Sequence, residues 1–202
     1  MKNENILRSL VREIMSEAVQ LNPALLGKVG GQNALVFGPN AQKFLVSKGM
    51  TQAEVVTVSG RINNMSETTF KANDSIFKSQ AAAFGLKPSL LKAMSIEETT
   101  LGKSMTNAAG STAAGLLQIT KPTIDTLNAN LPAGTHYDYN KLAGNPALSV
   151  KAVAHYIKFF LIDKRGLNDR ASILKAYKTG PDAANYAARV EAFKKFVDIV
   201  GI

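Results

Sequence analysis

Apolar residues recur at helical spacing near the start of the chain and again over its second half. Within residues 5–19, Ile6, Leu10 and Ile14 share one side of a helix, and charged residues occupy the other side. This pattern predicts an amphipathic helix over residues 1–20. Such a helix would either dock on the rest of the molecule or bind a partner.

A different pattern separates these two regions. In residues 21–75, glycines break the chain into short apolar runs, of which the clearest are ALVF at residues 34–37 and EVVTV at residues 54–58. Short runs between turn-forming residues are typical of strands and loops. We therefore expect a loop-rich accessory segment with two short strands, which serves as a structural extension or as a binding appendage.

The helical period returns at Ile76 and continues to the end of the chain. Proline fits the first turn of a helix because its missing N–H would be unpaired there, so Pro88 and Pro146 indicate two helix starts. The sequence thus predicts a mainly α protein whose domain over residues 76–202 is all-helical. Its expected helices cover residues 88–99, a short stretch from residue 122, and residues 145–161, 170–177 and 182–199.

Composition excludes several classes of protein. The chain has no cysteine and only two histidines, so disulfides and a thiolate metal site are ruled out and no metal centre is expected. The first residues lack the continuous apolar core of a signal peptide, and no stretch approaches the roughly 20 apolar residues of a membrane span. We expect a protein made without a secretion signal of its own.

The net charge of +9 predicts attraction to a polyanion. The basic residues are dispersed, without an arginine-rich run or interleaved aromatic residues, so nucleic acid is a poor candidate. Anionic polymers of a bacterial envelope agree with the same charge.

Two adjacent glutamates at the end of the expected helix over residues 88–99 are candidate catalytic acids. A carboxyl group can act as a general acid only if it keeps its proton near neutral pH, and an apolar pocket raises the pKa of a glutamate in this way. Glu98 lies on the same helical face as Leu91 and Met94, whereas Glu97 shares a face with Leu90 and Met94. Periodicity alone leaves both glutamates open.

Three segments together resemble a known family. Residues 93–103 read AMSIEETTLGK, residues 115–119 read GLLQI and residues 176–181 read AYKTGP. This set resembles the lytic transglycosylases of the soluble type and the related goose-type lysozymes, in which Glu-Ser, Gly-Leu-Met-Gln and Ala-Tyr-Asn-x-Gly recur. The resemblance implies a lysozyme-like helical fold, peptidoglycan as substrate, no cofactor, and Glu98 as the catalytic acid.

The resemblance also assigns supporting residues. Thr99 takes the place of the serine, and Tyr177 is expected to hydrogen-bond the glutamate and hold its orientation. Lys178 stands where asparagine is common, and we expect it to face solvent or carboxylates of the substrate. For substrate binding, the resemblance implies Gly115, Leu116, Leu117, Gln118, Tyr156 and Lys178.

The reaction could be hydrolytic or not. A hydrolase needs a second carboxylate to place water, whereas a lytic transglycosylase uses the C6 hydroxyl of N-acetylmuramic acid and one glutamate as acid and then base. No Asp or Glu occurs between Thr99 and Ile124, and Asp125 is the nearest candidate. We therefore expect the non-hydrolytic reaction, with 1,6-anhydromuramyl ends.

The expected setting is bacteriophage infection. An enzyme without its own signal fits an endolysin that waits in the host cytoplasm for a holin, or a virion-associated enzyme, and in either case it would act on peptidoglycan as a monomer. Two alternatives stay open. One is a hydrolytic muramidase, and the other is a non-catalytic wall-binding virion protein on the same fold.

Overall fold

The computed structural model describes residues 21–103 and 112–201, and the predicted helix over residues 1–20 lies outside them. The described chain is mainly helical, with two small antiparallel hairpins, which confirms the predicted fold class. Its first half contains η1 (Pro23–Leu25), β1 (Leu26–Val29), β2 (Gln32–Leu35), α2 (Pro39–Ser47), α3 (Gln52–Ile62), α4 (Glu67–Lys71), α5 (Asp74–Phe84) and α6 (Pro88–Thr99). The second half contains β3 (Ala113–Ala114), β4 (Ile119–Thr120), α7 (Lys121–Asn128), η2 (Tyr139–Lys141), α8 (Pro146–His155), η3 (Tyr156–Lys164), α9 (Arg170–Lys178) and α10 (Ala183–Val200).

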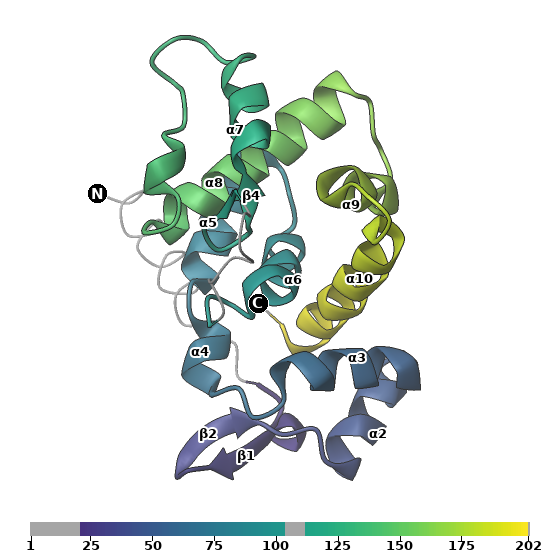
Figure 1. The fold of residues 1–202 in the computed structure, drawn as a ribbon. Coiled ribbons are helices and arrows are strands. Elements are labelled where there is room, and N and C mark those ends of the chain that lie inside the picture. The colour runs from purple at the N-terminus through teal and green to yellow at the C-terminus, as the bar shows by residue number, and fades with distance from the viewer. Residues whose placement is uncertain (1–20, 104–111, 202) are drawn as a thin grey trace, which may run out of the picture.

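Helix α6 is the centre of the molecule (Figure 1). It packs against α5 on one side and α10 on another, and α3 also contacts it. Nine of its twelve residues are buried, including Leu91, Met94 and Ile96. A helix that is buried on nearly every side needs other elements to cover it, so α6 depends on the rest of the fold around it.

The accessory segment is more helical than the sequence suggested. The run at residues 54–58 was expected to be a strand, but it lies within α3. Thr51 and Glu54 form a capping box that starts this helix, and Val55, Val58 and Ile62 are buried at helical spacing. The β-branched content of the run misled the prediction, because a strong N-terminal cap and a buried helical face outweigh β propensity.

The other predicted strand of this segment is confirmed in part. Strands β1 and β2 form a hairpin whose two-residue turn is Gly30–Gly31, with φ values of 56° and 81°. Positive φ at both central residues suits the twist of a tight hairpin, and glycine adopts it at little cost. The strand β2 covers the first part of the run at residues 34–37, and Phe37 follows it into the core.

The accessory segment shares one hydrophobic core with the helices that follow. Phe196 of α10 lies 5.7 Å from Phe37 and 5.8 Å from Phe70, measured between ring centroids, and the second pair is edge-to-face. Such aromatic pairs stabilise a contact beyond the area that they bury. The segment is therefore built into the same body as the helical domain.

Helix α8 leads directly into a π-helical segment, η3, where the sequence predicted one continuous helix. A π-helix widens the backbone and often occurs at functional sites. Here the change from α-helix to π-helix begins at Tyr156.

No helix within residues 21–103 or 112–201 is long and apolar enough to cross a membrane.

A buried ion pair joins α5 to α6. The Lys92 side chain is 0% exposed, and its Nζ lies 2.7 Å from Oδ1 of Asp74 and 3.8 Å from the centroid of the Phe70 ring. Burial lowers the pKa of Lys92 and raises that of Asp74, and the attraction between the two opposes both changes. The pair is therefore held together against a desolvation cost.

We predict that removing one partner of this ion pair destabilises the protein more than removing both. Asp74→Asn leaves the Lys92 ammonium buried without its carboxylate, so it should lower the free energy of unfolding by about 3 kcal/mol. The double variant Lys92→Met/Asp74→Asn removes the buried charge and should recover most of that loss. Urea unfolding of the three proteins checks this, and a double variant less stable than Asp74→Asn would contradict it.

Candidate active site

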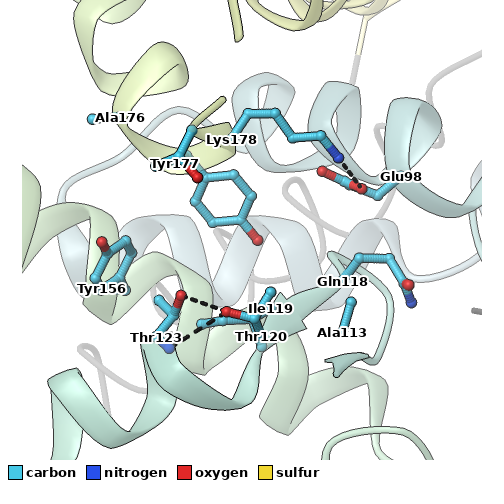
Figure 2. A pocket seen from close by; sticks show the side chains of 11 residues that line it. Glu98, Ala113, Gln118, Ile119, Thr120, Thr123, Tyr156, Ala176, Tyr177 and Lys178 are labelled. Atoms are coloured by element: carbon cyan, nitrogen blue, oxygen red, sulfur yellow. Dashed lines mark hydrogen bonds and ion pairs between the residues drawn. The ribbon is translucent and has the colours of Figure 1, made fainter. Parts of the chain in front are cut away.

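A cavity of about 290 Å³ opens beside the C-terminal end of α6 (Figure 2). Its walls come from α6, the β3–β4 hairpin, the start of α7, the first residue of η3 and the end of α9. The residues that line it are Glu98, Ala113, Gln118, Ile119, Thr120, Thr123, Tyr156, Ala176, Tyr177, Lys178 and Thr179. Of the predicted site residues, this set brings together Glu98, Gln118, Tyr156, Tyr177 and Lys178.

Glu98 stands in the last turn of α6 with its side chain 9% exposed. Burial raises the pKa of this carboxyl group, while the Lys178 ammonium and the Tyr186 hydroxyl act in the opposite direction. The net direction is upward. Glu98 is thus a carboxyl group that keeps its proton at higher pH than an ordinary glutamate does, which is what a general acid needs.

Glu97 has different surroundings. Arg189 of α10 donates a hydrogen bond of 2.8 Å from its Nε to the Glu97 carboxylate, and the same guanidinium bonds Asp182. Glu97 is absent from the residues that line the cavity. The structure therefore separates the two glutamates that the helical period could not, and it puts Glu98 at the cavity.

Lys178 is partly exposed and also lies beside the candidate acid. Its Nζ points toward Glu98 at the cavity and lies 3.7 Å from Oε2 of that residue (Figure 2). The side chain is 40% exposed, so the cation approaches the carboxylate from the solvent side.

Tyr177 has another partner than the one expected. Its hydroxyl donates a hydrogen bond of 2.6 Å to the backbone carbonyl of Leu117, not to Glu98. This bond ties the end of α9 to the β3–β4 turn. Tyr177 lines the cavity with its ring and holds its two walls together.

Tyr186 of α10 is a residue of the site that the sequence analysis missed. It is fully buried and near enough to Glu98 for each group to shift the pKa of the other. Its hydroxyl approaches the carboxylate without reaching the distance and angle of an ordinary hydrogen bond. Tyr186 shares a helical face with Val190 and Phe193, which is the pattern of an ordinary core residue. Its hydroxyl group is the only sequence feature that indicates another role.

Thr99 does not line the cavity but stabilises its wall through buried hydrogen bonds. Its side chain is fully buried, and Oγ1 donates a hydrogen bond of 2.9 Å to the carbonyl of Leu116 and accepts one of 3.0 Å from the backbone N–H of Gly102. These bonds fix the β3–β4 turn against the end of α6. Thr99 thus positions the segment that carries Gln118.

The turn itself differs from the predicted substrate contact. Gly115, Leu116 and Leu117 are buried, and none of them lines the cavity; the two leucine side chains pack in the core instead of facing a substrate. Gln118 does line the cavity; its Nε2 donates a hydrogen bond of 2.9 Å to the Gly115 carbonyl. Tyr156 also lines it, with its ring stacked on Phe160 at 5.3 Å.

Backbone conformation around the cavity is unusual. In the described residues, six non-glycine residues have positive φ, and four of them, Thr100, Leu101, Gln118 and Thr179, lie in or beside the segments that form the cavity. Such conformations cost free energy and persist only where the surroundings impose them, often at functional sites. The structure around the cavity therefore imposes a strained backbone on its walls.

Asp125, the candidate second carboxylate, does not reach the cavity. Its side chain is 56% exposed and pairs with Lys121 at 2.8 Å on the surface of α7. In the described part of the chain, Glu98 is the only carboxylate that lines the cavity, and no group of three potential metal ligands occurs.

A buried acid beside a polar cavity in a helical domain is the arrangement expected of a glycosidase of the lysozyme class. The family model of the transglycosylase SLT domain matches residues 75–199, which is more than half of the chain. The chain therefore belongs to this family, whose members are lytic transglycosylases of peptidoglycan. No curated protein and no solved structure matches it.

Gly115 generates a prediction about the turn. A Cβ added there would lie 2.3 Å from Oγ of Ser149 and 2.9 Å from the carbonyl oxygen of Leu142, at a φ of +73°. We expect Gly115→Ala to lower the free energy of unfolding by about 3 kcal/mol, through overlap added to left-handed strain.

Gly134→Ala is the matched control. It has a φ of +89° but no neighbouring atom within 4 Å of the added Cβ, so it should cost only the backbone term of about 1 kcal/mol. Urea unfolding compares the two variants, and equal losses would contradict the role of close packing at Gly115.

Proposed function

We propose that this protein cleaves the β-1,4 bond between N-acetylmuramic acid and N-acetylglucosamine without using water as nucleophile. The products would carry 1,6-anhydromuramyl ends. The observation that supports this most is that Glu98 is the one carboxylate lining the cavity in the described residues. A reaction that needs a single group as acid and then base fits such a site.

In the first step, the Glu98 carboxyl group donates its proton to the glycosidic oxygen, and the bond from that oxygen to C1 of the muramic acid breaks. N-acetylglucosamine leaves with a free C4 hydroxyl. The raised pKa of Glu98 keeps this proton available. In the second step, the C6 hydroxyl of the same muramic acid attacks C1, and the Glu98 carboxylate accepts its proton.

The surrounding residues would hold the sugar rings. Gln118 offers an amide and Thr120 and Thr123 offer hydroxyls at the cavity wall, which suits hydrogen bonds to acetamido and hydroxyl groups. Tyr156 presents an aromatic ring at the same wall. A role in bacteriophage infection stays a prediction from the sequence.

Mass spectrometry of the soluble products from purified peptidoglycan tests the proposal. The wild type should release anhydromuropeptides, and Glu98→Gln should lower the rate by a factor of about 10² to 10⁴, the usual contribution of a general acid. Glu97→Gln is the matched control, because it changes the neighbouring glutamate that pairs with Arg189, and it should keep most of the activity.

Each other result has a defined meaning. Reducing ends in place of anhydro ends would indicate a hydrolytic muramidase with a second carboxylate. No product from the wild type, together with firm binding to isolated sacculi, would favour the non-catalytic wall-binding protein. Equal losses in Glu97→Gln and Glu98→Gln would contradict the assignment of the acid to Glu98.

A further inference from the structure

Lys178 is the last residue of α9 and points at the candidate acid (Figure 2). Its Nζ lies 3.7 Å from Oε2 of Glu98 and 5.3 Å from the centroid of the Tyr186 ring. The ring face attracts a cation, so the ammonium has two favourable neighbours, the Glu98 carboxylate and the Tyr186 ring. A lysine in this position is not a generic surface charge.

The backbone directly after Lys178 is strained. Helix α9 ends at this residue, and the next residue, Thr179, has φ 43° and ψ 155°, a conformation that residues with a Cβ rarely adopt. The N–H of Thr179 still donates to the carbonyl of Lys175, so the chain turns away directly after the helix. Strain of this kind persists only where surrounding contacts impose it.

The other charged and titratable groups around Glu98 already have assigned partners or lie behind it. Glu97, on the same helix, is held by Arg189 of α10, which also holds Asp182. Tyr177 of α9 donates to Leu117. Tyr186 of α10 faces Glu98 from the core. Among the described residues that line the cavity, Glu98 and Lys178 are the two charged side chains.

We propose that Lys178 is a positioning residue for Glu98: its ammonium stabilises the carboxylate that Glu98 becomes once it has given up its proton, and so sets the upper pH limit of the reaction. This inference rests on the proposed function. Burial favours the protonated form and the cation favours the ionised form, so the two together let one group act as acid and then as base.

The sign of the effect follows from the charge. The acid must be protonated for the first step, so the rate falls as pH rises through the pKa of Glu98. Lys178 lowers that pKa. Removing the cation should therefore move the alkaline limb of the pH profile to higher pH. It should also make the ionised form of Glu98 less stable relative to the protonated form.

The test is the pH profile of kcat/KM on soluble glycan strands. For Lys178→Met we expect the alkaline limb to move up by roughly half to one pH unit, the size of effect expected from one partly solvated charge at this distance. Lys178→Arg keeps the charge and should keep the limb in place. Lys175→Met removes an exposed lysine one turn earlier on α9 and serves as the matched control.

A second measurement does not depend on turnover. Titration of protein labelled with ¹³C at glutamate carboxyl groups, with the Glu98 signal assigned by its loss in Glu98→Gln, should show Glu98 ionising at higher pH in Lys178→Met than in the wild type. If the wild type proves inactive, the proposed function fails, and this titration still decides the role of Lys178.

Two results would overturn the inference. An unchanged alkaline limb and an unchanged Glu98 titration in Lys178→Met, with only a raised KM, would show that Lys178 binds substrate and does not act on the acid. A limb that moves equally in Lys178→Arg would show that the shape of the lysine matters and its charge does not.

Discussion

The burial of α6 is the constraint on which the rest of the structure depends. This helix is covered by α5, α10 and α3, and its buried residues form the middle of a core that runs from Leu21 to Val200. The helix ends where this cover opens, at the cavity. Because Glu98 lies in its last turn, the same packing that stabilises the fold also desolvates the candidate acid.

The accessory segment contributes to this burial instead of standing apart. Its helix α3 packs on α10 as well as on α6, and the Arg61 guanidinium donates hydrogen bonds to the carbonyls of Ile96 and Glu97 in the last turn of the central helix. Free C=O groups at a helix end need partners. The first part of the described chain therefore supports the last turn of α6, at the two residues before Glu98.

Local signals made much of the fold predictable from the sequence. Pro88 and the periodicity after it placed the helix over residues 88–99, where α6 lies. Pro146 and the cap at Asn145 placed the start of α8 in the same way. The strand expected at residues 54–58 failed because the capping box of Thr51 and Glu54 and the buried contacts of α3 with other helices both favour a helix there, and no local pattern contains those contacts.

The site was predictable only where its residues carried a motif. Helical period could not separate Glu97 from Glu98, since the difference comes from Arg189, which is 92 residues further along the chain. The direction of Lys178 and the proximity of Tyr186 also depend on how α9 and α10 pack. Tertiary packing determines which of these side chains become partners, and the sequence alone shows only which charged and polar groups are present.

The proposed chemistry of the site depends on two opposed effects at one carboxyl group. Burial alone would hold the proton too firmly for the group to give it to the substrate, and a nearby cation alone would leave no proton to give. Glu98 meets both conditions, with the protein interior on one side and Lys178 on its solvent side. The strained residues Thr179 and Gln118 lie on two walls of the cavity, so the fold places the two side chains whose opposed effects the proposed reaction requires.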